Sequence, residues 1–324
     1  MTSRPAAQTI CVLGGTGFIG REIAGELIRR GYRVRVPTRD RRRARSLQVL
    51  PGVEVVTADI HNEAALRALF ADATAVINLV GILNEKRRDG SGFHRVHVEL
   101  VEKIVDACQE SGVHQLLHVS ALKANAETGP SHYLRTKGAG EQAVKNLSGD
   151  ELHYTIFQPS VVFGPGDDFI NRFAKLLRIA PILPLAKPNA RFAPVFVGDV
   201  ARAVCAALKN HHAYDRTFQL YGPNEYTLRE IVEEIAAELG LRRHIIGLSE
   251  IMSRIQAWLF DYLVPGRIFT MDNFRSLAVA SVGTENGLAA LGISPTPMRS
   301  VIPRYVNAGA YQRQLSGFRT RRGS

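Results

Sequence analysis

GGTGFIG, residues 14–20, is the stretch of sequence that decides the fold. It follows the apolar run Thr9–Leu13, which predicts a buried strand, and it leads into residues 21–31, where apolar side chains recur at helical spacing. A glycine turn between a strand and a helix favours phosphate binding, because free amide hydrogens and the positive end of the helix dipole converge there. We therefore expect a ligand phosphate at this turn.

Each glycine of the turn has a predicted role. Gly14 permits the tight turn, Gly17 lets the backbone approach a pyrophosphate, and Gly20 lets the helix pack closely against the sheet. Thr16 is expected to cap the helix with its hydroxyl. The spacing G-x-x-G-x-x-G matches the generic dinucleotide pattern only loosely, so the alternative is a plain turn, which the flanking strand and helix disfavour. The predicted cofactor-binding residues of the turn are Gly14, Thr16, Gly17, Phe18 and Ile19.

The composition indicates a globular protein with a sizeable core. The chain has 324 residues, 45% of them hydrophobic, which suits one large α/β domain or a domain with an appended lobe. Cys11, Cys108 and Cys205 stand singly in apolar segments and are expected to be buried, reduced thiols, as in a cytosolic protein. The glycine turn leaves no room for a signal peptide, and no apolar run reaches the ~18 residues of a spanning helix. We expect a cytoplasmic protein, with a peripheral position at the inner face of a membrane as the alternative.

The formal net charge of +11 has two main sources, the basic run at 41–45 and the C-terminal residues 308–324. Neither run is interleaved with aromatic side chains or accompanied by a nucleic-acid-binding motif, so we expect no nucleic-acid partner. We interpret the C-terminal residues as a flexible, solvated basic tail. Attraction of this tail to an anionic membrane or a protein partner is the alternative.

The first half of the chain alternates strand and helix patterns. After the glycine turn, strands are predicted at 33–37, 53–57, 75–80 and 115–119, with helical segments between them, the last at about 94–110. Repeated units of this kind form a parallel sheet with helices on both faces, and ligands bind at the carboxyl ends of its strands. The predicted fold class is α/β, a Rossmann-type doubly wound parallel sheet with a smaller C-terminal lobe.

The end of the second strand bears on the choice of cofactor. An arginine at this position pairs with the 2′-phosphate of NADP, whereas an acidic residue accepts hydrogen bonds from the ribose diol of NAD. Arg39 comes first and Asp40 follows it, so we expect NADP(H) to be preferred and keep NAD(H) as the alternative. The other interpretation of Arg39 is an ordinary surface arginine within a basic run.

The third and fourth strands end in further candidate cofactor contacts. Asp59 and Ile60 are placed to contact the adenine with a carboxylate and an apolar face. A glycine after the fourth strand lets the backbone pass near the cofactor. The predicted residues at the end of that strand are Leu79, Val80 and Gly81.

Three polar residues after the fifth strand have the spacing of a catalytic group. Tyr133 and Lys137 lie one helical turn apart on one face, so the ammonium is expected to lower the pKa of the phenol toward a range useful for proton transfer. Ser120, at the end of the strand, would hydrogen-bond the substrate oxygen that gains or loses the proton. The alternative for this spacing is a solvated helix face, which the preceding nucleotide turn disfavours.

With these motifs the chain resembles the short-chain dehydrogenase/reductase superfamily, in its extended and atypical branches of the NAD-dependent epimerase/dehydratase type. The glycine turn and YLRTK (133–137) are shared, and PSVVFGPGD (159–167) resembles the segment with the nicotinamide-side loop. Gln158 departs from the pattern, since arginine is frequent there. The resemblance implies cofactor contacts from Tyr133, Lys137, Pro159, Val161 and Val162.

Within that superfamily the chain is most similar to the atypical branch that contains the nucleotide-binding accessory subunit of mitochondrial respiratory complex I and its bacterial relatives. The similarity is in SALKANA (120–126), YLRTKGAGE (133–141), DDFINRFAKLL (167–177), MDNFRSLAVASV (271–282) and LAALGISPTPM (288–298). It implies an NAD(P)H-binding Rossmann domain. It does not imply turnover, because the mitochondrial subunit is regarded as holding its nucleotide structurally.

The regular alternation of strands and helices ends near residue 221. The predicted parts are a NAD(P)-binding domain at 8–220 with lobe segments near 165–192, a substrate or partner lobe at 221–307 and the tail at 308–324. In the second lobe, residues 251–263 predict an amphipathic helix with Ile251, Ile255, Trp258 and Tyr262 along one side. We expect this side to pack in the core, and a membrane or partner face is the alternative.

Two classes of function follow from the sequence. The first is an oxidoreductase or epimerase-like enzyme that uses NADP(H) on a carbonyl or quinone-type substrate. The alternative is a catalytically silent accessory or assembly factor of a membrane respiratory complex, in contact with that complex or the membrane. An NADP-sensing regulator is disfavoured because the YLRTK motif at 133–137 is intact. The histidines show no metal-ligand spacing, so no metal is predicted.

Overall fold

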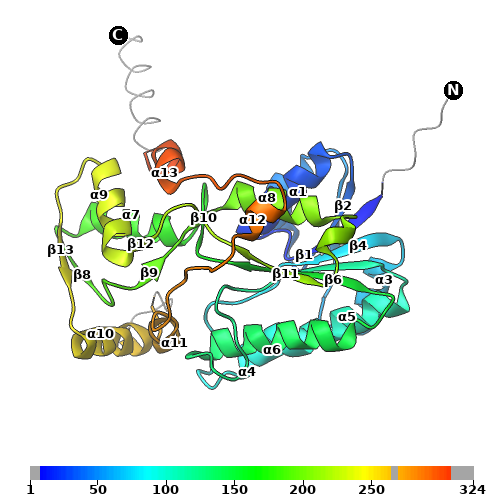
Figure 1. Ribbon diagram of the computed structural model, residues 1–324, viewed down its shortest axis with the longest axis horizontal. Helices are drawn as coiled ribbons and strands as arrows, with labels where there is room; N and C mark the ends of the chain where they lie inside the picture. The colour runs from blue at the N-terminus through cyan, green and yellow to red at the C-terminus, as the bar shows by residue number, and fades with distance from the viewer. Residues whose placement is uncertain (1–7, 264–268, 308–324) are drawn as a thin grey trace, which may run out of the picture. The chain divides into compact units, whose positions relative to one another are not determined.

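The largest sheet of the structure has seven parallel strands (Figure 1). The protein is represented by a computed structural model that describes residues 8–263 and 269–307. The strands run in the order β11-β6-β5-β4-β1-β2-β3, and every neighbouring pair is parallel. This order confirms the predicted Rossmann-type fold. The strands are β1 Thr9–Leu13, β2 Arg33–Thr38, β3 Val53–Thr57, β4 Ala73–Asn78, β5 Gln115–Val119, β6 His153–Pro159 and β11 Arg216–Leu220.

Helices cover both faces of this sheet (Figure 1). One face is covered by α1 Phe18–Arg29 and α8 Val197–Ala207, and the other by α3 Glu63–Phe70, α5 Leu100–Glu110 and α6 His132–Leu147. Such two-sided burial explains why the central strands β1 and β4 have apolar residues at successive positions instead of alternating apolar and polar ones. The shorter helical elements around the sheet are η1 Arg41–Ala44, α2 Arg45–Gln48, α4 Ser91–His94, η2 Arg95–Glu99, η3 His211–Ala213 and α12 Gly287–Ala290.

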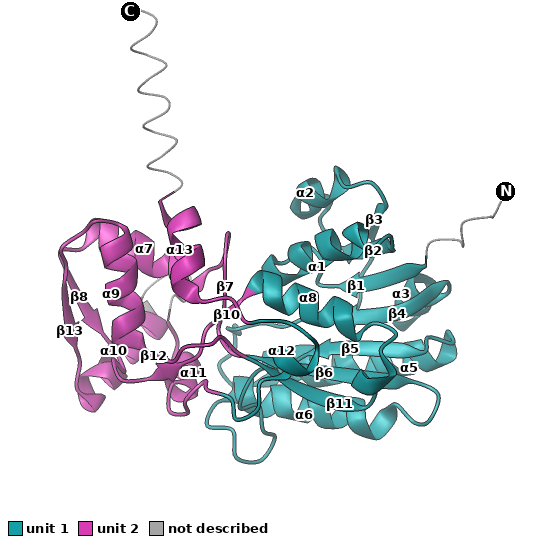
Figure 2. Ribbon diagram, turned by 45° about the horizontal axis from the view of Figure 1, so that its top comes forward, with its two compact units in different colours: residues 1–159, 197–220, 283–294 teal, residues 160–196, 221–282, 295–324 magenta. Residues whose placement is uncertain are grey.

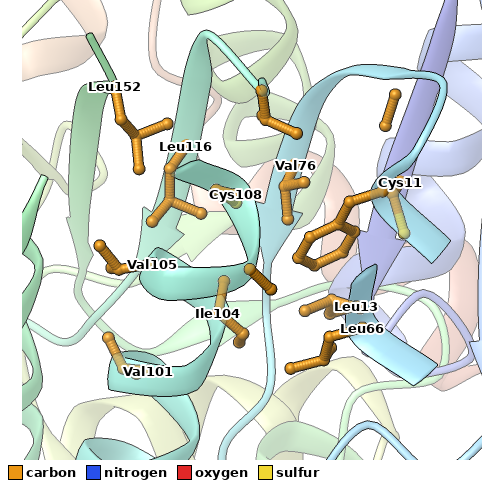
Figure 3. Close-up of a cluster of buried hydrophobic side chains, with 14 of the residues drawn as sticks. Cys11, Leu13, Leu66, Val76, Val101, Ile104, Val105, Cys108, Leu116 and Leu152 are labelled. Carbon is orange, nitrogen blue, oxygen red and sulfur yellow. The ribbon is translucent and has the colours of Figure 1, made fainter. Parts of the chain in front are cut away.

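The core beneath the sheet brings strand and helix side chains together (Figure 3). Cys11 and Leu13 of β1 face α3 and α5, whereas Ile10 and Val12 point to the opposite face. All three cysteines are buried free thiols, as predicted. Burial raises the pKa of Cys11 to about 12, so this thiol stays protonated and acts as a small apolar side chain.

The chain divides into two compact units (Figure 2). Unit 1 contains the sheet and consists of residues 1–159, 197–220 and 283–294, and unit 2 consists of residues 160–196, 221–282 and 295–324. The elements of unit 2 are β7 Val162–Phe163, α7 Phe169–Ile179, β8 Ile182–Leu185, β9 Arg191–Phe192, β10 Val195–Phe196, β12 Tyr226–Thr227, α9 Leu228–Glu238, β13 His244–Gly247, α10 Glu250–Leu263, α11 Met271–Ser276 and α13 Met298–Val306.

Unit 2 has its own apolar core, in which α7, α9 and α13 pack together. Asp167 orders the loop before α7, because its carboxylate accepts the Ile170 amide at 2.6 Å and the Tyr305 hydroxyl at 2.8 Å. Burial raises the pKa of this carboxyl. Among the described residues, none of the helices combines the length and the apolar character needed to cross a bilayer.

The prediction that the apolar side of 251–263 packs in the core is wrong. Ile251 is 74% exposed and Trp258 50% exposed, whereas Ser253, Ala257 and Asp261 are buried on the opposite side of α10. The inward side is polar because it makes specific hydrogen bonds. The Ser253 hydroxyl accepts the amide of Lys187, and the Asp261 carboxylate accepts the amide of Met271.

Candidate nucleotide-binding and catalytic site

The glycine turn has the geometry that its sequence predicts. Gly14 has φ +79°, a left-handed conformation that favours glycine, and a Cβ there would lie 3.2 Å from the carbonyl carbon of Leu79. A Cβ on Gly20 would lie 2.5 Å from both the Gly14 oxygen and the Gly15 Cα. The start of α1 therefore rests directly on the backbone of the turn, and only glycine allows this approach.

The N-terminus of α1 fits a phosphate group. Its N-cap is Gly17, which makes no side-chain cap, and the first turn contains no acidic residue. The expected cap from Thr16 is not formed, because the helix begins one position too late for its hydroxyl. The first helical bond runs from the Arg21 amide to the Gly17 oxygen, so within the described chain the amides of Phe18 and Ile19 have no partner. These amides are therefore available to a pyrophosphate.

At the end of β2, Arg39 and Asp40 have different surroundings. The Asp40 carboxylate accepts the backbone amide of Arg42 at 3.0 Å and its Nε at 3.1 Å, and it caps η1. These hydrogen bonds hold the pKa of Asp40 below its ordinary value. Arg39 is exposed and makes no hydrogen bond or ion pair with any residue that the structure describes. The Asp40 carboxylate is thus engaged in hydrogen bonds with Arg42, and the Arg39 side chain is the group available to a ligand.

The end of β3 is shaped by local hydrogen bonds. The Asp59 carboxylate accepts the His61 amide at 3.1 Å, and Asn62 caps α3 by accepting the Ala65 amide. Ile60 packs against the core beneath the sheet. Asp59 itself is exposed at the carboxyl edge, where a carboxylate can accept hydrogen bonds from a ligand.

The loop after β4 passes beside the glycine turn. The Leu79 amide donates to the Leu13 oxygen at 3.0 Å, and the Val80 amide donates to Oδ1 of Asn78 at 3.0 Å. This second bond ends the strand at Asn78, two residues earlier than predicted, because it turns the backbone out of the sheet. Gly81 follows, exposed, and the Ile82 amide donates to Nε2 of His97 at 3.1 Å.

His97 lies on a π-helical turn, η2, within the helix that was predicted as regular at 94–110. Nε2 accepts from Ile82, so Nδ1 bears the proton and donates to the Thr136 hydroxyl at 2.9 Å. Burial lowers the pKa of His97 to about 2, with the charge of Lys137 acting in the same direction. The neutral ring lies edge-on to Tyr133, 5.6 Å between centroids. His97 thus links the loop after β4 to α6, the helix that contains Tyr133 and Lys137.

Gly140 makes the close approach of these helices feasible. A Cβ on this residue would lie 2.1 Å from the His97 oxygen, which is too close for any other amino acid. The π-turn at η2 and the missing side chain on α6 therefore act together, and π-turns of this kind are frequent at functional sites.

A pH-dependent loss of stability is expected from His97. Its folded-state pKa lies below the ordinary value of 6.5, so below that pH the unfolded chain binds a proton that the folded chain does not. The free energy of unfolding should then fall by up to about 1.4 kcal/mol per pH unit between about pH 6.5 and pH 2, and His118, whose pKa is also lowered, adds to the slope.

Urea unfolding of the unmutated protein and of His97→Asn, between about pH 7 and pH 5, measures how much of the pH dependence of stability comes from His97. In His97→Asn, the slope of the unfolding free energy against pH should be smaller than in the unmutated protein by up to about 1.4 kcal/mol per pH unit. His94→Asn, at an exposed position one helical turn earlier, is the matched control and should keep the full slope. Equal slopes for the unmutated protein and His97→Asn would show that His97 takes no part.

The effect of Lys137 on the pKa of Tyr133 differs from the prediction. Lys137 is buried and its ammonium donates to the Val119 oxygen at 2.7 Å, and burial lowers its pKa to about 8. Burial raises the pKa of Tyr133 to about 12, the opposite of the expected direction. The physical reason is that desolvation penalises the phenolate while the ammonium is directed at a backbone carbonyl. Tyr133 is therefore a protonated phenol.

Ser120 lies buried at the carboxyl end of β5, and its hydroxyl has no hydrogen-bond partner among the described residues. The Glu141 carboxylate nearby accepts both of its hydrogen bonds from Gln158 Nε2, at 2.9 Å. Burial raises the pKa of Glu141, and the Ser120 hydroxyl partly offsets this without reaching hydrogen-bond geometry. An unpaired buried hydroxyl is costly, so this one is available to a substrate oxygen.

His118 is a second polar group on this face of β5. Its Nδ1 accepts the Asn78 side-chain amide at 3.1 Å, and its Nε2 is buried without a partner in the described part of the chain. Burial keeps the pKa of His118 well below its ordinary value, so the ring is neutral. The motifs in the sequence did not predict a part in this site for His97, His118 or Glu141. A signal existed for His118, a polar residue inside an apolar strand, but none for His97, whose partners are distant in the sequence.

Contacts join the glycine turn, the loop after β4 and the helix α6 at the carboxyl edge of the sheet, whereas within the described chain no such contact links Arg39, Asp59 or Ile60 to them. Gly14 contacts Leu79, the loop after β4 contacts His97, and His97 contacts Tyr133 and its helix. Lys137 of that helix then reaches the end of β5. Pro159 is tied to the same edge, because its oxygen accepts the Leu122 amide at 2.9 Å.

Val161 and Val162 belong to unit 2, and their part in cofactor binding stays a prediction. Gln158, which departs from the superfamily pattern, donates to Glu141 and so helps to hold that buried carboxylate. No group of three or more His, Cys, Asp or Glu side chains suited to a metal ion occurs in the part of the chain that the structure describes.

The parallel sheet, the open helix N-terminus and the polar groups at the end of β5 define an NAD(P)-binding protein of the Rossmann type. The chain belongs to the NAD dependent epimerase/dehydratase family, whose sequence model matches residues 10–221. This finding confirms the resemblance to the short-chain dehydrogenase/reductase superfamily.

Individual relatives include both redox enzymes and a respiratory subunit. The chain is 30% identical to NADH dehydrogenase (ubiquinone) 1 alpha subcomplex subunit 9 of Rattus norvegicus mitochondria, over 89% of this chain and 76% of that protein. It is also 30% identical to ceramide reductase of Caulobacter vibrioides, over 76% of this chain and 75% of the relative. The fold is shared with the NADPH complex of the quinone oxidoreductase QOR2 from Escherichia coli, with a TM-score of 0.71, 16% identity, and coverage of 91% of this chain and 99% of that one.

Proposed function

We propose that this protein is an NADP(H)-dependent oxidoreductase that reduces a carbonyl or quinone-type substrate. The observation that supports this proposal best is the buried, unpaired hydroxyl of Ser120 beside the helix with Tyr133 and Lys137. When bound, the nicotinamide supplies or accepts a hydride. The chain itself provides the proton and the groups that orient the substrate oxygen.

The roles of the three residues follow from their protonation states. Tyr133 keeps its proton, since burial raises its pKa to about 12, so it is suited to donate that proton to a carbonyl oxygen that gains negative charge. Ser120 orients the same oxygen by a hydrogen bond. Lys137 holds the end of β5 in place and contributes positive charge near the developing phenolate.

The preference for NADP(H) rests on Arg39. Replacing Arg39 with alanine should weaken NADPH binding by about 10- to 100-fold, because a hydrogen bond to a charged group contributes about 1.5–3 kcal/mol. NADH binding should stay within about threefold, since NADH has no 2′-phosphate. Fluorescence titration with both cofactors measures the two affinities.

Arg33→Ala is the control for this experiment, because Arg33 is an exposed arginine at the opposite end of the same strand. It should leave both affinities unchanged. Equal affinity of the unmutated protein for NADPH and NADH would remove the proposed preference, whatever the variants do.

The substrate class is tested with a panel of carbonyl and quinone compounds, including lipid ketones, and NADPH oxidation as the readout. Similarity to a ceramide reductase and to the fold of a quinone oxidoreductase supports this choice of panel. Turnover of at least one class is expected. NADPH binding without turnover on any member would remove the proposed enzymatic activity.

The second candidate function is a nucleotide-loaded accessory or assembly factor of a membrane respiratory complex, located in the cytoplasm or at the inner face of the membrane. Similarity to the mitochondrial NADH dehydrogenase subunit favours it. Affinity purification from membranes distinguishes the two candidates. Co-purification with respiratory subunits, together with no turnover, supports the accessory role, and a protein that co-purifies with none of them argues against it.

A further inference from the structure

Helix α10 of unit 2 presents its large apolar side chains outward. The exposed set occupies one side of the helix, with spacings of one, three and four residues. These side chains, which we call the apolar face of α10, are Ile251 (74% exposed), Met252 (50%), Ile255 (46%), Trp258 (50%), Leu259 (39%) and Tyr262 (53%). Contiguous exposed apolar surface of this kind marks an interaction site on a folded protein.

The orientation of α10 is held by hydrogen bonds on its inward side. The Ser253 hydroxyl accepts the Lys187 amide at 3.2 Å, and Gln256 Nε2 donates to the Pro184 oxygen at 3.0 Å. Near the other end, the Asp261 carboxylate accepts the Met271 amide at 3.2 Å, while Ala257 is fully buried. A rotation that buried the apolar face would expose these groups and break their bonds, so the outward direction is built into unit 2.

The charges around the apolar face suit an anionic surface. Of the two acidic residues of α10, Asp261 is buried and Glu250 is paired with Lys187 at 2.5 Å. Arg254 on α10 and Arg275 on the adjoining α11 are exposed, and the whole chain has a formal net charge of +11. Basic residues beside an apolar helix face add electrostatic attraction to anionic headgroups.

The aromatic residues of the face suit the boundary between headgroups and acyl chains. Trp258 and Tyr262 are stacked, with 5.4 Å between their ring centroids and 27° between their planes. Tryptophan and tyrosine each combine an apolar ring with a polar group, and they are enriched at membrane interfaces for that reason. With 14 residues, α10 is too short to cross a bilayer and has the length of a helix that lies in its surface.

We propose that the apolar face of α10 docks this protein on the surface of an anionic lipid bilayer. Ile251, Ile255 and Trp258 would enter the acyl boundary, while Arg254 and Arg275 contact lipid phosphates. A lipid surface is favoured over a protein partner by the stacked aromatic pair, by the exposed arginines, and by acidic groups that are either paired, as Glu250 is with Lys187, or buried, as Asp261 is. The inference stands apart from the proposed reaction, because it involves none of the nucleotide-binding or catalytic residues.

Vesicle binding of the full chain tests this inference, and Trp258 is the reporter because it is the only tryptophan. With phosphatidylcholine vesicles that contain phosphatidylglycerol, the tryptophan emission should shift to the blue and the protein should float with the vesicles. Binding to phosphatidylcholine alone should be weaker. High salt should weaken binding to the anionic vesicles.

The double variant Ile251→Ser with Ile255→Ser should reduce vesicle binding by at least about tenfold, because each loses buried apolar carbons at the acyl boundary. Both positions are exposed, so its thermal unfolding and NADPH affinity should match those of the unmutated protein. The matched control is Val49→Ser with Leu147→Ser, which changes two exposed apolar residues of unit 1 (78% and 40%) and should bind vesicles normally.

Two results would overturn the inference. One is unchanged tryptophan emission and no flotation with either type of vesicle. The other is a blue-shifted emission without vesicles that rises with protein concentration, together with a dimer in sedimentation, since the apolar face would then be covered by a second copy of the chain.

Discussion

Replacing Gly20 with alanine should reduce NADPH affinity by at least about 100-fold, which corresponds to a loss of about 2.7 kcal/mol of binding free energy. The new Cβ would lie 2.5 Å from the Gly14 oxygen and from the Gly15 Cα, and both are backbone atoms that cannot rotate away. The start of α1 would have to move, and the amides of Phe18 and Ile19 would move with it. The overpacking should also destabilise the fold by about 1–3 kcal/mol.

Gly25→Ala in the same helix is the matched control. A Cβ at this position has only the Arg29 side chain within 4 Å, at 3.6 Å, so there is space for it. Alanine should stabilise the protein by about 0.5–1 kcal/mol and leave the affinity unchanged. Isothermal titration with NADPH and urea unfolding measure the two effects. If Gly20→Ala bound NADPH as tightly as the unmutated protein, the phosphate site would have to lie elsewhere.

Tyr133→Phe should lower kcat by about 10²- to 10⁴-fold while NADPH affinity stays within about threefold. The phenylalanine ring keeps the edge contacts of Tyr133 with His97 and Phe93, whose centroids lie 5.6 and 6.2 Å away. The variant therefore loses the proton that the phenol donates and retains its packing. Steady-state kinetics on the most active member of the substrate panel measures the loss.

Tyr214→Phe is a close control, because Tyr214 also lies edge-on to a histidine, His211, at 4.9 Å. It should leave kcat unchanged. A rate in Tyr133→Phe equal to that of the unmutated protein would remove the proposed proton donor without affecting the nucleotide site. Gly20→Ala tests cofactor binding and Tyr133→Phe tests the proton transfer. A protein whose function is lost with Gly20→Ala but not with Tyr133→Phe would fit the accessory role.

The sheet could be predicted from sequence because its signals are local. The segments predicted as strands at 9–13, 53–57 and 115–119 match β1, β3 and β5 in full. β1 and β5 are buried along almost their whole length, which favours the apolar runs seen there, whereas β3 lies at the edge of the sheet and keeps Glu54 exposed. The fourth strand was misplaced at 75–80. Its real end depends on the side chain of Asn78, which accepts the Val80 amide, and an apolar run does not show where such a bond forms.

The electrostatics of the candidate site could not be predicted in the same way. The spacing of Tyr133 and Lys137 correctly places both on one helix, α6. The pKa of Tyr133 depends instead on burial and on the direction of the Lys137 ammonium, which donates to Val119, 18 residues away. His97 is a stronger case, because its two partners come from β4–α4 and α6 and only the folded chain brings them together.

Local patterns were thus sufficient for the α/β class, the glycine turn and the order of the motifs, because each depends on neighbouring residues. Only the tertiary structure determines which side of an amphipathic helix packs against the rest of its unit. The spacing of Ile251, Ile255, Trp258 and Tyr262 shows that they share one side of α10, and the same spacing fits a buried or an exposed face. Hydrogen bonds from Ser253 and Asp261 to residues outside α10 direct the opposite side inward, and no periodicity in the sequence encodes them.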